Sequence, residues 1–244
     1  MCFIFKLWIK INFLNLTKAI LDAPTLKLPR IDGKGVYEFK AYPFGEAGLT
    51  LEPELIKEIR RGLVDCVKKY FPDFDLIVGI DYEGGIWGGL LAHDLKKGFT
   101  EFFPLEGYKS SFMGTILLLL ACYFDKPVKF VRCYTKRYEP FRDSKKSDKY
   151  GFFKVRSAYE TKWLGYNRDS FKPGSSVLLF DDLISEGGTA NASLNVLINE
   201  LNVEVVGMQV ILAKSDKYRE VERKWSVPIK FLATLNENAV EFSV

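Results

Sequence analysis

Apolar residues recur with two different spacings along the chain, and the spacing predicts which segments are helices and which are strands. Residues 51–71 carry an apolar position every fourth residue, the spacing of one helix face, and Pro53 stands at the start. Residues 35–44 (GVYEFKAYPF) alternate polar and aromatic side chains, as a half-exposed strand does. The pattern therefore predicts a strand followed by a long amphipathic helix.

From residue 75 onward, strand-like segments alternate with helical ones. Strands are predicted at 75–80, 128–134, 177–180, 203–213 and 229–235. Helices are predicted after a loop at 81–85, at 114–124, from the turn at 185–189 to about 201, and at 216–225. This alternation indicates an α/β fold with a mostly parallel central sheet flanked by helices.

Three segments fall outside that alternation. Residues 1–31 form an N-terminal extension, residues 99–112 read as irregular, and residues 135–172 are rich in Lys, Arg, Asp, Ser and Tyr without a sustained period. We expect 135–172 to be a long, mobile, partly stranded loop, and loops of that length in compact domains are usually functional.

Composition narrows the class of protein. The 244 residues suffice for one large domain or two small ones, and a net charge of +4 from 35 basic and 31 acidic residues is too mild to indicate nucleic acid. The four cysteines show no CxxC pair and the single histidine, His93, has no cysteine near it, so we expect reduced thiols, a cytoplasmic protein and no zinc site. Lys6 and Lys10 interrupt the apolar N-terminus, which predicts packing on the body or on a partner subunit and not a membrane span.

The segment VLLFDDLISEGGTA (177–190) carries the strongest chemical signal. Its apolar run predicts a buried strand, and ligands of open α/β sheets bind where such strands end. Gly187 and Gly188 then allow the backbone to approach an anion at a helix start, where N–H groups and the helix dipole hold phosphate. Asp181 and Asp182 cannot bind phosphate, but they can accept hydrogen bonds from sugar hydroxyls. A sugar phosphate suits this combination. A divalent cation would offset the repulsion between the two acidic side chains and a polyphosphate.

This segment resembles the phosphoribosyl pyrophosphate motif of type I phosphoribosyltransferases. The resemblance implies the type I phosphoribosyltransferase fold. It also implies that Asp181 and Asp182 contact the ribose. It assigns the 5-phosphate to Ser185, Gly187, Gly188 and Thr189. Glu186 departs from the family pattern, and its carboxylate is expected to point away from the phosphate.

Two further segments extend the resemblance, the second toward the orotate branch of the family. Residues 74–95 resemble the pyrophosphate-loop region, which implies roles for Asp81, Tyr82, Glu83 and Gly84, although Glu83 stands in a loop where the family often has Lys or Arg. Residues 126–140 resemble the strand and catalytic loop of the orotate branch, which implies that Arg132 and Lys136 are catalytic. Basic residues there would neutralise charge as pyrophosphate departs.

The resemblance also implies a domain layout and partners. Residues 32–244 would form a single domain, with a hood subdomain over about 32–50 that covers the base and a mobile loop over about 135–172. We expect a homodimer, and Mg²⁺ held through the ligand near Asp181 and Asp182 with no ligand directly from the protein. No membrane association is expected, and nucleic acid binding is not favoured.

The implied reaction transfers ribose 5-phosphate from phosphoribosyl pyrophosphate to a nitrogenous base, orotate-like or purine, and releases pyrophosphate. It needs no protein nucleophile, which suits a chain with one histidine and no recognisable triad. Two alternatives stay open. A non-catalytic regulator that binds phosphoribosyl pyrophosphate is favoured by Glu83 and Glu186, and a nucleic-acid-binding role is permitted by the basic and aromatic segment 136–156.

Overall fold

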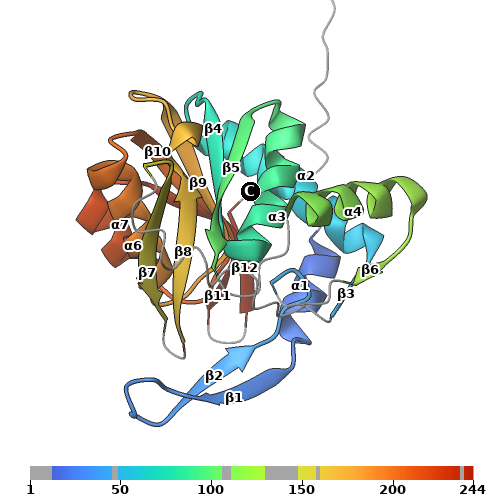
Figure 1. Cartoon of the computed structure of the whole chain (residues 1–244). Helices are drawn as coiled ribbons and strands as arrows, with labels where there is room; N and C mark the ends of the chain where they lie inside the picture. Colours follow the sequence, from blue (N-terminus) through green and yellow to red (C-terminus); the bar gives the residue numbers. More distant parts are fainter. Residues whose placement is uncertain are drawn as a thin grey trace, which may run out of the picture.

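The computed structural model describes residues 13–45, 49–105, 111–129, 148–157, 160–236 and 239–243. Its centre is an eight-stranded sheet of order β12-β11-β10-β9-β4-β5-β8-β7 (Figure 1). The strands are β4 (Leu76–Ile80), β5 (Gly98–Pro104), β7 (Tyr150–Arg156), β8 (Thr161–Asn167), β9 (Ser176–Ile184), β10 (Glu204–Ala213), β11 (Ile229–Asn236) and β12 (Ala239–Phe242).

Strands β11, β10, β9, β4 and β5 are parallel to one another. Strands β12 and β8 flank them and run antiparallel to them, and β7 at the edge pairs antiparallel with β8. Parallel sheets need cover on both faces because their connections place helices there. The middle strand β9 shows this directly. Leu178 and Phe180 pack into the apolar core on one face, while Val177 and Leu179 pack into the core on the other.

Helices cover both faces, as Figure 1 shows. The first core packs against α1 (Leu14–Leu21), α2 (Pro53–Tyr70), α3 (Asp81–Leu95) and α4 (Ser111–Phe124). The second packs against α6 (Gly188–Asn195), the π-helical turn η2 (Val196–Glu200) and α7 (Tyr218–Trp225), and a 3-10 turn η1 (Arg168–Ser170) precedes β9. No helix among the described residues is both long and apolar enough to cross a membrane.

Two small pairs of strands lie outside the main sheet. Strand β1 (Thr25–Pro29) pairs antiparallel with β2 (Val36–Lys40), and this hairpin extends from one end of the molecule (Figure 1). Strand β3 (Thr50–Leu51) pairs antiparallel with β6 (Val128–Lys129). Strand β1 falls in the predicted N-terminal extension (1–31), and β2 falls in the predicted hood (about 32–50). The hairpin therefore joins these two segments.

The predicted α/β fold is confirmed, but three local predictions were wrong. Residues 99–112 are not irregular, because residues 98–104 form β5 beside β4. The strand predicted at 128–134 is a two-residue strand outside the main sheet, and residues 130–134 lie outside the described residues. No loop separates β4 from its helix, because α3 begins at Asp81.

A buried carboxylate joins the N-terminal helix to the body. The side chain of Glu58 on α2 accepts hydrogen bonds from the backbone N–H of Leu16 at 2.7 Å and of Asn15 at 3.3 Å. First-turn N–H groups have no partner within their own helix, and Phe13 at the N-cap offers no side-chain acceptor. Glu58 therefore caps α1 from the neighbouring helix.

Replacing this cap should cost stability. We expect Glu58→Ala to lower the free energy of unfolding by about 1–3 kcal/mol, because it leaves buried donors unsatisfied. The exposed Glu54→Ala on the same helix is the matched control and should change it by less than about 0.5 kcal/mol. Denaturant unfolding of both variants measures the difference, and equal effects would contradict a capping role for Glu58.

Candidate active site

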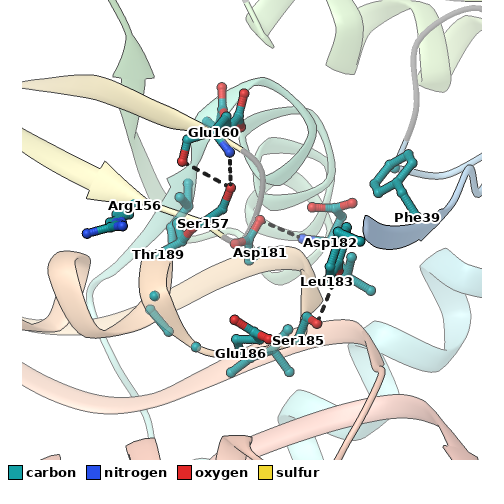
Figure 2. A pocket seen from close by; sticks show the side chains of 18 of the residues that line it. Phe39, Arg156, Ser157, Glu160, Asp181, Asp182, Leu183, Ser185, Glu186 and Thr189 are labelled. Carbon is teal, nitrogen blue, oxygen red and sulfur yellow. Dashed lines mark hydrogen bonds between the residues drawn. The ribbon is translucent and has the colours of Figure 1, made fainter. Parts of the chain in front are cut away.

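A cavity of about 630 Å³ lies where β4 and β9 end, the edge at which ligands bind in open α/β sheets. It is bordered by the β1–β2 hairpin, the start of α3, the β7–β8 hairpin, and the turn from β9 into α6. Figure 2 shows Asp181 and Asp182 at its border, with Phe39 from the hairpin and Thr189 from the start of α6.

The turn between β9 and α6 depends on two glycines. Gly187 has φ of 75°, a left-handed conformation that favours glycine, and it precedes the first residue of α6. A Cβ on Gly188 would lie 2.3 Å from the carbonyl oxygen of Arg156 on β7. No side chain in the described part of the chain hydrogen-bonds the amides of Gly188 or Thr189. The helix start therefore faces the cavity with donors available to an anion.

A side-chain link braces this turn from the opposite side. The Nδ2 of Asn191 donates to the carbonyl of Gly187 at 2.9 Å, and the Nε1 of Trp225 donates to the Oδ1 of Asn191 at 2.8 Å. Helix α7 thus fixes the position of the turn. Sequence reasoning missed this link, since nothing near residue 191 points to Trp225.

Asp181 is a buried carboxyl group, with its residue only 8% exposed. Its Oδ1 accepts a hydrogen bond from the backbone N–H of Asp182 at 3.0 Å. Burial raises the pKa of Asp181 to about 7, and the nearby charge of Asp81 adds to the rise, while the Asp182 hydrogen bonds and Lys162 oppose it. The helix α3 can pack this closely because residue 84 is glycine, where a Cβ would lie 3.0 Å from that Oδ1.

The β1–β2 hairpin is tied to the turn by polar contacts. The hydroxyls of Tyr37 and Ser185 are hydrogen-bonded at 3.3 Å, and Lys214 donates to the Tyr37 hydroxyl at 3.2 Å. Glu186 forms ion pairs with Arg30 of the hairpin at 3.6 Å and with Lys217 at 3.3 Å. Two cations therefore offset the charge of Glu186, the residue that departs from the family pattern.

The start of α3 carries a charged cluster. Asp81 has φ of 59°, its Oδ1 accepts from the N–H of Tyr82 at 2.8 Å, and its Oδ2 is ion-paired with Lys162 of β8. Lys162 also pairs with Glu160 at 3.2 Å. Burial alone would lower the pKa of Lys162, but the two carboxylates outweigh it and hold that pKa above its ordinary value. Lys162 and Glu160 were not predicted from the sequence.

The predicted site residues fall into three groups. One cavity is lined by Asp81, Glu83, Asp181, Asp182, Ser185, Gly187, Gly188 and Thr189. Tyr82 packs against the apolar core and Gly84 is buried beneath Asp181, so neither lines the cavity. Arg132 and Lys136 lie outside the described residues.

The chain is similar in sequence to known proteins. The sequence matches the phosphoribosyl transferase domain family over residues 49–244. It is 29% identical over 163 residues to the adenine phosphoribosyltransferase of Halothermothrix orenii, which covers 66% of this chain and 72% of that protein. It is 32% identical over 143 residues to the adenine phosphoribosyltransferase of Thermosipho africanus, covering 59% and 61% of the two chains.

Solved structures of the same class share the fold. Adenine phosphoribosyltransferase from Rhodothermus marinus superposes with a TM-score of 0.54 at 20% identity, covering 91% of this chain and 99% of that one. The Giardia lamblia enzyme complexed with 9-deazaadenine gives a TM-score of 0.56 at 16% identity, covering 87% and 94%.

Fold and site together define an α/β protein of the type I phosphoribosyltransferase class. The chain belongs to the phosphoribosyl transferase family, and it is a phosphoribosyltransferase. The family, fold and enzyme class predicted from residues 177–190 are confirmed. The relatives described above are adenine enzymes, whereas the sequence resemblance pointed to the orotate branch.

The buried state of Asp181 predicts a pH effect on stability. A carboxyl whose pKa rises from 3.8 to about 7 on folding binds a proton in the folded state that the unfolded chain has lost, so stability falls as pH rises from about 4 to 7. Asp181→Asn removes that titration. We expect its free energy of unfolding to match wild type near pH 4 and to exceed it increasingly toward pH 7, by at most about 1.4 kcal/mol per pH unit.

Denaturant unfolding of both proteins between pH 4 and 8 measures this difference. The exposed Asp169→Asn is the matched control for the removal of a surface carboxyl group. A constant difference for Asp181→Asn would contradict the burial of an ionisable Asp181.

Proposed function

We propose that the protein transfers the ribose 5-phosphate group of phosphoribosyl pyrophosphate to a ring nitrogen of adenine and releases pyrophosphate. The observation that carries the proposal is the cavity in which two adjacent carboxyl groups border an uncapped helix start. That pairing suits a ligand with hydroxyls on one side and a phosphate on the other.

Each part of the ligand has a matching part of the cavity. The backbone amides of Gly188 and Thr189, with the hydroxyls of Ser185 and Thr189, bind the 5-phosphate at the start of α6. Asp181 and Asp182 accept hydrogen bonds from the ribose hydroxyls. The braced turn and the hairpin contacts hold these groups in place before the ligand arrives, which reduces the ordering cost of binding.

The charges around the cavity are consistent with Mg²⁺ as cofactor. Seven carboxyl side chains and four basic ones line it, namely Asp32, Asp81, Glu83, Glu160, Asp181, Asp182 and Glu186 against Arg30, Lys40, Arg156 and Lys162. No group of three or more potential metal ligands occurs among the described residues. We therefore propose that the ion is held mainly by ligand oxygens, near Asp181 and Asp182, where it would neutralise diphosphate charge.

The reaction follows from positioning and charge stabilisation. The base nitrogen forms a bond to C1 of the ribose while the C1–O bond to pyrophosphate breaks, and the electron pair leaves with pyrophosphate. Asp181 and Asp182 hold the ring by its hydroxyls so that C1 faces the incoming base. The base nitrogen loses its proton to solvent water, and no covalent intermediate with the protein forms.

The hairpin offers a surface for the base. Phe39 of the hairpin lines the cavity (Figure 2), and its ring can contact a planar base. Tyr42 also lines the cavity, and its buried hydroxyl has no hydrogen-bond partner among the described residues, so a polar edge of the base would satisfy it. Adenine is our choice because the relatives are named for adenine.

We also propose a homodimer, in line with the family resemblance. Helix α4 presents apolar side chains to solvent, with Leu117 at 40%, Leu120 at 44% and Phe124 at 60% exposure. Contiguous exposed apolar side chains commonly mark association surfaces.

The activity is tested by turnover with phosphoribosyl pyrophosphate, Mg²⁺ and a panel of adenine, hypoxanthine, guanine, orotate and uracil. We expect adenine to react fastest, with one pyrophosphate released per nucleotide formed. Asp182→Asn should lower kcat/KM by about 10- to 100-fold, because it weakens a charge-assisted hydrogen bond to the ribose. Asp169→Asn, at an exposed position that does not line the cavity, should leave kcat/KM unchanged.

The outcomes separate the candidate functions. Tight binding of phosphoribosyl pyrophosphate without turnover on any base would favour the non-catalytic regulator. Absence of binding would overturn both functions.

A further inference from the structure

Strand β8 brings a lysine to the edge of the sheet where the ligand binds. It runs antiparallel to β5, with Pro104 at the end of β5 opposite Leu164, so residues before Leu164 lie beyond the carboxyl end of β5. Lys162 occupies such a position, and its ammonium group reaches Asp81 at the end of β4. Its side chain lines the cavity and is 27% exposed.

The charges at this end of the cavity pose a problem for a diphosphate. Asp81 and Glu83 both line the cavity at the start of α3, and residues 81–85 contain no lysine or arginine. Carboxylates repel a diphosphate group, so the ligand needs a cation at this position. Lys162 is the cation that the described structure places beside Asp81.

The other basic side chains that line the described cavity lie elsewhere. Arg30 and Lys40 belong to the β1–β2 hairpin, and Arg30 is already paired with Asp32 and Glu186. Arg156 is exposed, and Figure 2 shows its side chain directed away from Asp181. Lys162 alone among these four contacts the cluster at the start of α3.

We propose that Lys162 holds the pyrophosphate group and stabilises its charge as it leaves. The proposal rests on the proposed transferase function. In the free protein, Asp81 and Glu160 share the ammonium group of Lys162, and the bound diphosphate replaces at least one of these carboxylates as its partner. When the C1–O bond breaks, charge grows on the departing oxygen, and a preplaced cation stabilises it without transferring a proton.

This assignment predicts opposite effects for the two members of the ion pair. Lys162→Met removes the cation and should weaken the binding of pyrophosphate with Mg²⁺ by about 10- to 100-fold, the worth of a charge-assisted contact. Asp81→Asn removes a competing carboxylate and should strengthen that binding. A lysine that only serves the fold would make both variants change in the same direction.

The experiment is isothermal titration calorimetry of the full chain with two probes, pyrophosphate plus Mg²⁺ and ribose 5-phosphate. We expect Lys162→Met to leave ribose 5-phosphate affinity within about twofold of wild type, because that ligand lacks the diphosphate. Lys162→Arg should recover most of the pyrophosphate affinity. Lys154→Met, at an exposed position on the neighbouring strand β7, is the matched control and should bind both probes as wild type does.

The outcomes test the role of Lys162 separately from the proposed transferase function. Pyrophosphate affinity of Lys162→Met within about threefold of wild type would overturn the assignment, as would equal weakening for both probes or weaker binding by Asp81→Asn. Failure of the wild-type protein to bind pyrophosphate would also overturn it. Failure of the wild type to bind ribose 5-phosphate would instead overturn the proposed transferase function.

Discussion

The site depends on one backbone constraint, the close passage of the turn after β9 between its neighbours. The chain leaves the middle of the sheet at Ile184 and enters α6 at Gly188, whose Cα faces the carbonyl of Arg156. A side chain at that position would force β7 and α6 apart. Because this backbone approach is possible, the helix start, the paired carboxyl groups and the β7–β8 hairpin border the same cavity.

Electrostatic balance is the second constraint on this cavity. Burying Asp181 costs stability at neutral pH, and an enzyme keeps such a group where its chemistry requires it. Lys162, Arg30 and Lys217 offset neighbouring carboxylates in separate ion pairs, so the free protein holds its acidic groups without large repulsion. Of these three cations, Lys162 and Arg30 line the cavity, and Lys162 is the one we propose to meet the charge of a diphosphate.

A feature could be predicted from the sequence when all of its residues lie in one short segment. Residues 177–190 contain strand, carboxylates, glycines and helix start in one continuous segment, so the fold class and the turn from β9 into α6 were predictable. Lys162, which pairs with Asp81, and Trp225, which holds Asn191, are brought to the site only by sheet order and helix packing. Single-sequence patterns do not contain that information.

The wrong local predictions also have physical causes. Strand β5 mixes glycine, charge and aromatic residues, because it is only partly buried, and its pattern therefore did not resemble the apolar strands beside it. Residues 81–85 were expected to form a loop because they are acidic and glycine-rich. In the structure Gly84 lets the first turn of α3 pack tightly against Asp181, and Gly79 on β4 lets the strand approach Gly84 and Gly85.

The central claim is that the turn at Gly187 and Gly188 binds the phosphate of a sugar whose hydroxyls contact Asp181 and Asp182. Calorimetric titration of the wild-type protein with ribose 5-phosphate and with ribose tests it directly. The account predicts binding of ribose 5-phosphate and at least about 100-fold weaker binding of ribose, since phosphate contacts supply most of the affinity. Equal affinity for the two sugars, or no binding of ribose 5-phosphate, would contradict it.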